Sequence, residues 1–181
     1  MIVKLKDIII RKLEIDDCYE AKQVINKVWR IAYADFMPQS VFDKKDAGIE
    51  ESVKKFKKQL QNNEIFGYVA IVDSKIVGVA IARNLTTYEH YKSLGFADLQ
   101  VLYILPEYQG IGLGSKFFKL VRDDFKNAGI TKMLICALEK NVNARAVYEK
   151  WGGKLDETHK KDYETCGETF VDVFYLFDLK K

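Results

Sequence analysis

The sequence predicts a single mixed α+β domain over residues 1–181, built on a central, mostly antiparallel sheet flanked by helices. The first observation is a pair of closely spaced β-branched runs in the first half of the chain, which is typical of an antiparallel hairpin. The second is the order strand, helix, strand, helix after residue 97, which predicts a parallel crossover. The third is the length, because 181 residues suffice for one well-buried core.

The N-terminal part is expected to hold one strand and two amphipathic helices. Residues 8–13 alternate weakly and predict a strand, after which Asp16 or Asp17 can cap a helix that runs to about Tyr33. A second helix is expected from Gly48 to Asn62, because its apolar residues recur at intervals of three and four.

A hairpin and a loop follow these helices. Residues 65–72 and 75–82 are β-branched runs joined by Asp73-Ser74, which predicts two antiparallel strands and a tight turn. Residues 84–96 lack a sustained period and are expected to form a loop or a short helix.

The second half of the chain alternates between strands and helices. Strands are expected at residues 99–105 and 132–138, and helices at 112–128 and 141–151. Two closing strands, at about 154–159 and 169–179, are joined by a polar segment around Lys161 to Gly167.

Composition and charge narrow the functional classes. Hydrophobic residues make up 48% of the chain and only 2 residues are proline, which indicates an ordered globular protein. The formal net charge of +3 comes from interspersed residues of both signs. This pattern argues against a nucleic-acid partner and allows a small anionic ligand.

The cysteines and the N-terminus predict a soluble cytoplasmic protein. Cys18, Cys136 and Cys166 are widely spaced and form neither a disulfide framework nor a metal-ligand pattern, so a reducing compartment is expected. Residues 1–10 are too short and too charged for a signal peptide, and no segment has the length of a membrane span.

A glycine-rich segment joins the strand ending at Leu105 to the helix that follows. Gln109-Gly110-Ile111-Gly112-Leu113-Gly114 lets the backbone approach a ligand without hindrance from Cβ atoms. Unpaired N–H groups in the next helical turn supply donors and a positive dipole end. The segment therefore predicts an anion site, although the same glycines taken alone could form only a tight turn. Ser115 and Lys116 can add a hydroxyl and a charge.

Two other phosphate-binding loops fit the sequence less well. A Walker lysine is missing from the required place. The glycines also lie behind an antiparallel hairpin, whereas a dinucleotide-binding loop opens its fold. Nucleotide hydrolase and dehydrogenase functions are therefore disfavoured.

Over roughly its C-terminal half, the chain resembles the GNAT superfamily of N-acetyltransferases. Gln109-x-x-Gly112-x-Gly114 is similar to that family's Gln/Arg-x-x-Gly-x-Gly/Ala signature, and residues 102–108 resemble the strand and turn before it. A second segment, Asn141-x-x-Ala144-x-x-x-Tyr148-Glu149-Lys150-x-Gly152, is similar to the family's motif on the helix after the fifth strand. Gly153 departs from the family, which commonly has Phe at this position.

The resemblance implies a coenzyme A site and acetyl-CoA as cosubstrate. Backbone amides from about Gly110 to Ser115 would hold the pyrophosphate, and Asn141 would cap its helix and reach the pantetheine arm or the thioester. The coenzyme-binding residues implied in this way are Tyr103, Ile104, Leu105, Gln109, Gly110, Ile111, Gly112, Leu113, Gly114, Ser115, Asn141 and Asn143.

Acyl transfer to an amine requires a base, because an amine with a pKa near ~10.4 is almost fully protonated at pH 7. Asp98 begins the strand that leads to the glycine loop, where the family often places a Glu that acts directly or through water. The alternative for Asp98 is a solvated carboxylate at a strand start. Glu107 is a weaker candidate, because the turn after Pro106 should face outward.

The departing thiolate requires an acid, and the charge on the carbonyl oxygen requires donors. Tyr148, in the second motif, is the candidate acid, because its reference pKa of ~10 lies above the ~8.5 of a thiol. Taken alone, Tyr148 would be interpreted as a core tyrosine. The N–H of Ile104 or Leu105 is the candidate donor to the oxygen.

Cysteine and histidine chemistry is not expected. Cys136 lies inside an apolar strand, which favours an unreactive thiol and direct transfer over an acyl-cysteine intermediate. His90 and His159 have no partners at the spacing of metal ligands, so no metal site is predicted.

The expected acceptor is a primary amine of a small molecule or peptide, such as a polyamine, an amino sugar or drug, or a protein amine. Its contacts should come from residues 29–39 and 84–95, which offer the aromatic and acidic side chains Tyr33, Phe36, Tyr88, Tyr91 and Glu89. A non-catalytic acyl-CoA sensor or interaction module is the alternative, although the presence of both Asp98 and Tyr148 argues against it.

The final strand is expected to lie at an exposed edge of the sheet. Such an edge could pair with a second chain and allow a homodimer. The apolar residues of this strand are Phe170, Val171, Phe174, Tyr175 and Phe177.

Overall fold

The computed structural model describes residues 4–180. Residues 1–3 and 181 lie outside it, and with them the ends of the expected single domain and the start of the segment considered as a signal peptide. Within the described residues, one sheet has the strand order β1-β2-β3-β4-β5-β7-β6. Its strands are β1 (Ile9–Lys12), β2 (Phe66–Val72), β3 (Lys75–Arg83), β4 (Ala97–Ile104), β5 (Lys132–Leu138), β6 (Lys154–Thr165) and β7 (Glu168–Asp178).

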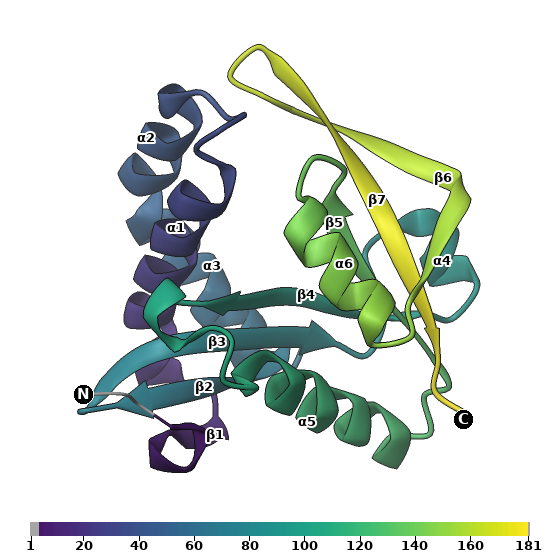
Figure 1. Cartoon of the computed structure of the whole chain (residues 1–181), viewed down its shortest axis with the longest axis horizontal. Helices are drawn as coiled ribbons and strands as arrows, with labels where there is room; N and C mark the ends of the chain where they lie inside the picture. Colours follow the sequence, from purple (N-terminus) through teal and green to yellow (C-terminus); the bar gives the residue numbers. More distant parts are fainter. Residues whose placement is uncertain (1–3, 181) are drawn as a thin grey trace.

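All neighbouring strands are antiparallel except β4 and β5, which are parallel. Helices cover both faces of this sheet (Figure 1). The mixed α+β fold with a mostly antiparallel sheet is therefore confirmed. The helices are α1 (Cys18–Tyr33), α2 (Gln39–Ala47), α3 (Ile49–Gln61), α4 (Glu89–Ser93), α5 (Leu113–Asn127) and α6 (Val142–Lys150).

Two hydrophobic layers hold the helices to the sheet. On one face, the apolar stripe of α5 packs on β3, β4 and β5 through residues such as Phe117, Val121 and Phe125. On the other face, α1 and α3 pack on β2 and β3 through residues such as Val28 and Phe56. The three- and four-residue spacing of these side chains explains why the sequence predicts α1, α3 and α5.

The short helix α2 is the element that the sequence does not predict. It buries only Val41 and Phe42, which are adjacent in the chain and therefore give no helical period. Asp17 holds the N-cap position of α1, as expected, but its carboxylate pairs with Arg11 at 2.6 Å and makes no capping bond to this helix. No helix within residues 4–180 has the length and apolar character needed to cross a membrane.

Strands β4 and β5 separate soon after they begin. Only Ala97–Met133 and Asp98–Leu134 are paired between them. Beyond these residues β4 stays paired with β3, and β5 stays paired with β7 along its whole length. The carboxyl halves of β4 and β5 therefore diverge and leave an opening between the two parts of the sheet (Figure 1).

The C-terminal strands correct one expectation. Strand β7 lies between β5 and β6, so it is internal, and the apolar side chains expected at an exposed edge are mostly buried. The edges of the sheet are β1 and β6. Strand β6 also runs further than expected, to Thr165, because Cys166 and Gly167 both take positive φ and make a tight turn.

The unusual Gly153 has a packing reason. A Cβ atom at this position would lie 2.6 Å from Cζ of Phe177 and 2.9 Å from the carbonyl oxygen of Tyr148. The ring of Phe177 on β7 therefore occupies the space beside the end of α6, and any side chain at residue 153 would displace it.

Candidate active site

The glycine loop presents backbone N–H groups at the start of α5. Gly110 has φ +74° and Gly112 has φ +91°, a conformation that glycine adopts without strain. The N–H of Lys116 bonds to the Gly112 carbonyl at 3.0 Å. Within residues 4–180, the N–H groups of Leu113, Gly114 and Ser115 have no backbone acceptor, so they are free to bind an anion.

Side chains around the loop hold its shape. The Gln109 side-chain amide donates to the Ile104 carbonyl at 2.8 Å, and its N–H donates to the Pro106 carbonyl at 3.1 Å. The Ser115 hydroxyl accepts a bond from the Trp151 indole N–H at 3.2 Å. Gln109 therefore fixes the turn after β4 with its backbone N–H and one side-chain N–H.

The end of β4 decides which amides point into the opening. The Leu105 N–H donates to the Val77 carbonyl of β3 at 2.9 Å, so it is not available to a ligand. Because amides of an antiparallel strand alternate in direction, those of Ile104 and Leu102 point away from β3 toward β5. Of the two amides considered in the sequence analysis, Ile104 remains, and Leu102 is added.

Tyr148 lies on α6 with its ring buried and its hydroxyl unpaired. Its ring packs near Trp151 and Tyr175, and 9% of the residue is exposed. No other residue within 4–180 hydrogen-bonds to the hydroxyl. Burial raises the pKa of Tyr148 above its ordinary value, and the nearby Tyr33 and Cys136 raise it further. The hydroxyl is therefore a proton donor at neutral pH.

The two asparagines of the second motif differ in position. Asn141 is the N-cap of α6, where its Oδ1 accepts from the Ala144 N–H at 3.2 Å. Its amide lies near the Tyr33 hydroxyl and lowers the pKa of that group. Asn143 is exposed on the first turn of α6. The capping role expected for Asn141 is therefore confirmed.

Asp98 is buried, which contradicts the solvated alternative. Only 1% of the residue is exposed, and its Oδ2 accepts from the Thr86 hydroxyl at 3.2 Å. Its Oδ1 has no hydrogen-bond partner among the described residues. Burial raises the pKa of Asp98 to about 7, against the smaller lowering effects of Thr86 and Arg83. The carboxylate is thus poised to exchange a proton near neutral pH.

A bulge in β4 turns Asp98 toward the acceptor side. Residues five apart on a regular strand point to opposite faces, so Asp98 and Tyr103 would be separated by the sheet. Here Ala82 pairs with Leu99 and Ile81 pairs with Val101, which leaves Gln100 as an extra residue. The bulge restores Asp98 to the face of Tyr103.

Three aromatic residues bridge α1 and β4 on this face. The Trp29 indole N–H donates to the Tyr103 hydroxyl at 2.6 Å, and the hydroxyls of Tyr33 and Tyr103 are 3.2 Å apart. The Tyr103 side chain therefore faces α1, on the side opposite to α5. Trp29 was placed in the acceptor region by sequence, but its bond to Tyr103 depends on the packing of α1 against β4.

Asp172 is a candidate site residue that the sequence analysis missed. It lies on β7 opposite Leu138 of β5, beside Cys136 and Tyr88. Burial raises its pKa, and Lys161 acts in the opposite direction. An available signal was its alternation with Phe170 and Phe174, which places a carboxylate on a buried face.

Cys136 is half-buried beside the same carboxylate. Burial raises the pKa of its thiol well above the ordinary value, and Asp172 adds to this effect. A thiol in this state is a poor nucleophile at neutral pH, which agrees with the expectation of direct transfer.

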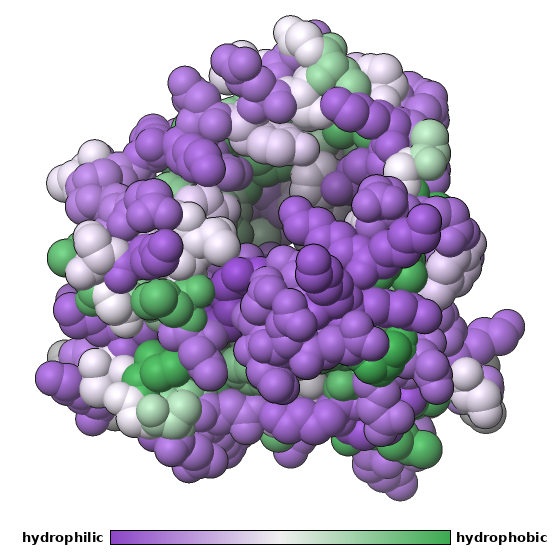
Figure 2. Space-filling model, turned by 180° about the vertical axis from the view of Figure 1, so that it is seen from behind, coloured by the Kyte–Doolittle hydropathy of each residue, from purple (hydrophilic) through white to green (hydrophobic). Residues whose placement is uncertain are grey.

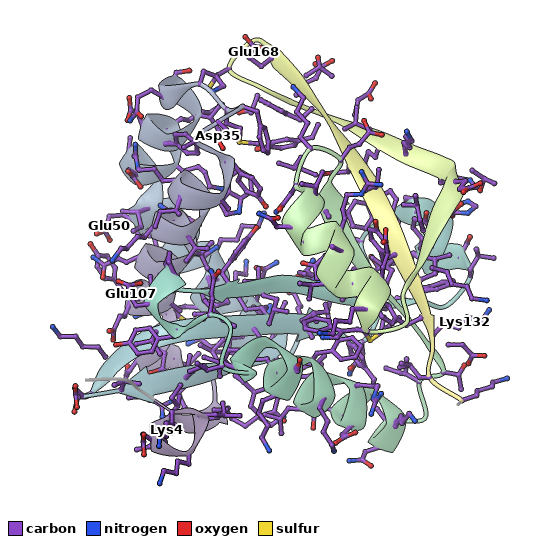
Figure 3. The ribbon with its side chains drawn as sticks, in the orientation of Figure 1. Lys4, Asp35, Glu50, Glu107, Lys132 and Glu168 are labelled. Carbon is purple, nitrogen blue, oxygen red and sulfur yellow. The ribbon has the colours of Figure 1, made fainter. Side chains whose placement is uncertain are left out.

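The space around these residues is open to solvent. Side chains from α1 project toward those of β5 and α6 across the opening, while Glu107 lies at the outer turn after β4 (Figure 3). Seen from behind, the surface has a hollow whose walls include apolar residues and whose rim is hydrophilic (Figure 2). Tyr91 does not join it, because it is buried and its hydroxyl bonds to Asp156 at 2.9 Å.

The histidines also differ from expectation. His90 and His159 lie with their rings stacked, at 3.5 Å between centroids, next to Asp156. The statement that the two histidines have no partners at the spacing of metal ligands is therefore wrong. The fold brings His90 of α4 together with Asp156 and His159 of β6.

Known proteins resemble this chain in sequence. The acetyltransferase (GNAT) family pattern matches residues 26–153. A thialysine N-epsilon-acetyltransferase from Caenorhabditis elegans is 24% identical over 130 residues, which are 71% of this chain and 74% of that protein.

Solved structures agree in fold. A PaiA N-acetyltransferase from Thermoplasma acidophilum, in complex with coenzyme A, is 23% identical with a TM-score of 0.71, over 94% of this chain and 98% of that one. A GCN5-related N-acetyltransferase from Rhodopseudomonas palustris is 15% identical with a TM-score of 0.74, over 98% of each chain. Since the family pattern spans more than half of the sequence, the chain belongs to the GNAT acetyltransferase family and is an N-acetyltransferase.

Proposed function

We propose that the protein transfers an acetyl group directly from acetyl-CoA to the primary amine of a small molecule or peptide. The observation that carries this proposal is the opening between β4 and β5. Tyr148 offers an unpaired hydroxyl beside it, and Asp98 offers an unpaired carboxylate oxygen at its closed end. An acid and a base are thereby available on one site.

The residues of the loop fit coenzyme A. The free N–H groups of Leu113, Gly114 and Ser115 at a helix N-terminus suit a pyrophosphate. The edge of β4 that faces away from β3 can bind the pantetheine arm as a neighbouring strand would. Asn141, at the start of α6, lies across the opening from this edge. Ile111 and Asn143 would add contacts, whereas Gln109 and Tyr103 support the site from behind.

The proposed chemistry places each proton on a named group. The amine nitrogen attacks the thioester carbon, a C–N bond forms, and the C–S bond breaks. The N–H of Leu102 or Ile104 stabilises the oxygen while it carries negative charge. Tyr148 donates its proton to the departing thiolate and regains one from the attacking nitrogen through water, whereas the proton that the ammonium loses before attack passes to Asp98 and then to solvent. Asp98 pairs with Arg83 and Leu102 pairs with Ala80, so the two residues are three β3 positions apart, about 10 Å, and water carries that proton.

Two carboxylates support a cationic acceptor. Asp98 and Asp172 approach Cys136 from β4 and β7, and Tyr88 adds an aromatic face beside them. A negative site of this kind attracts an ammonium group, which then loses its proton to the base. The curated relative named for the N-epsilon position of thialysine supports a terminal aliphatic amine.

The test is an acceptor panel. Purified protein receives acetyl-CoA and, in turn, a polyamine, an amino sugar, lysine and a peptide with a free N-terminus, and released thiol is recorded. Thiol release with one class identifies the acceptor. Coenzyme binding by calorimetry, without thiol release on any amine, would instead favour a sensor and overturn the proposed function.

A further inference from the structure

The only two histidines of the chain lie in contact. His90 is on α4 and His159 is on β6, and their rings stack at 3.5 Å between centroids with 24° between planes. Asp156 lies beside them, and one ligand atom from each of the three residues lies within 4.8 Å of the others. This cluster takes no part in the proposed acetyl transfer.

An irregularity in β6 assembles the cluster. Leu155 pairs with Tyr175 and Lys160 pairs with Val173, so residues 156–159 face a single residue, Phe174. A bulge of this size releases the backbone from the ladder, which lets Asp156 and His159 turn to the same side. Bulges persist where they re-aim functional side chains.

The carboxylate of the cluster is held in place by neighbours. Asp156 Oδ2 accepts from the Tyr91 hydroxyl at 2.9 Å. Its Oδ1 accepts from the Thr158 N–H at 2.9 Å and from the Thr158 hydroxyl at 2.6 Å. His159 Nδ1 lies 3.4 Å from Asp156 Oδ2. Hydrogen bonds of this kind orient the ligands in metal sites.

We propose that His90, Asp156 and His159 bind a divalent transition-metal ion of the zinc class, with water in the remaining position. Two imidazoles and one carboxylate are a usual ligand set for Zn²⁺ and Co²⁺. Bonds of about 2.0–2.1 Å in a tetrahedral site place ligand atoms roughly 3.3 Å apart. His90 is exposed and can leave the stack to close the remaining distance.

The site would join α4 to β6. Tyr88, two residues before His90, lies beside Cys136 on the acceptor side. A bound ion therefore restrains the segment that carries Tyr88, while the glycine loop lies on other elements. The ion is structural and has no part in moving the acetyl group.

The experiment uses untagged, chelator-treated full-length protein. Calorimetry with Zn²⁺ measures stoichiometry and affinity, and Co²⁺ gives visible absorption that reports coordination. The expected result is one ion per chain, with affinity falling at least tenfold in His90→Ala and in His159→Ala. Cys166→Ser is the matched control, because it removes an exposed thiol outside the cluster and should change nothing.

Histidine NMR supplies a second readout, because the chain has no other imidazole signals. Both ring signals should shift when Zn²⁺ is added to the folded protein. The proposal is overturned if no ion binds, if both histidine variants bind as wild type, or if Cys166→Ser abolishes binding. Since His90 is exposed, His90→Ala should keep the fold and its circular dichroism spectrum.

Discussion

The proposed coenzyme side and the proposed acceptor side of this site are built in different ways. On the coenzyme side, one continuous segment from Ile104 to Ser115 supplies a strand end, a turn and a helix start, and its donors are backbone N–H groups. On the acceptor side, Tyr33, Tyr88, Asp98 and Asp172 come from α1, the segment before α4, β4 and β7, and would act through side chains.

The difference explains why a family can keep one cosubstrate and vary its acceptor. A backbone cradle depends on conformation, and glycine at positive φ is its main requirement. A side-chain pocket changes with each substitution on α1, α4, β4 or β7. The two sides should therefore respond differently to mutation.

The largest effect is expected for Tyr148→Phe, which removes the proton donor between the two sides. The turnover number should fall about 100-fold or more, because the thiolate leaves without a proton, while coenzyme affinity stays unchanged. Steady-state kinetics and calorimetry measure the two quantities. Tyr68→Phe, which removes a hydroxyl bonded to Asp124 outside the site, is the control. Equal turnover in wild type and Tyr148→Phe would remove Tyr148 as the acid.

Asp98→Asn should stabilise the fold at pH 8. Burial raises the folded-state pKa of Asp98 to about 7 from a reference of 3.8. Between these values the folded chain keeps a proton that the unfolded chain has released, so the free energy of unfolding falls as pH rises. Above pH 7 the fold carries the full cost of burying the ionised carboxylate.

Asparagine lacks this penalty, because it cannot ionise. The variant should gain on the order of a few kcal/mol over wild type at pH 8 and less at pH 5. Urea unfolding at the two pH values measures the difference. A variant less stable than wild type at pH 8 would show that burial of the ionised Asp98 carboxylate does not lower the stability of the fold.

Gly110→Ala tests the backbone side against a matched control. Gly110 and Gly129 have φ +74° and +73°, and an added Cβ would meet no atom within 4 Å at either position. Both alanine variants should lose about 1 kcal/mol of stability. Only Gly110→Ala should raise the KM for acetyl-CoA, by about tenfold or about 1.4 kcal/mol. Equal KM values for acetyl-CoA in the two variants would show that the coenzyme does not bind at Gly110.

The smallest effect is expected for Asp172→Asn, which removes one of two charges on the acceptor side. The acceptor KM should rise roughly fivefold, as for loss of a partly exposed ion pair, with coenzyme KM unchanged. Kinetics at saturating acetyl-CoA measure this ratio. A rise in the KM for acetyl-CoA, without a rise in the acceptor KM, would contradict the placement of Asp172 on the acceptor side.

Local patterns predicted most of the fold. The hairpin of β2 and β3, the helices α1, α3 and α5, and the glycine loop follow from spacing within single segments. Strand β7 was expected at an edge as the final strand of the chain, and the sequence order does not reveal that it inserts between β5 and β6.

The acceptor side was harder to predict, because it depends on pairing between distant elements. Asp98 was found only through the resemblance, and its burial depends on the bulge at Gln100 and on Thr86. Asp172 and the histidine cluster required the register of β6, β7 and β5. Sequence spacing describes single elements well and describes contacts between elements poorly.

The pH profile of kcat/KM in wild type and in Asp98→Asn tests the proposed base most directly. Wild type should gain activity as pH rises through about 7, where Asp98 releases its proton. The Asp98→Asn variant should lose this rise and be about 100-fold slower at pH 8. An unaltered rise in the variant, at wild-type activity, would contradict Asp98 as the base and the acceptor site built around it.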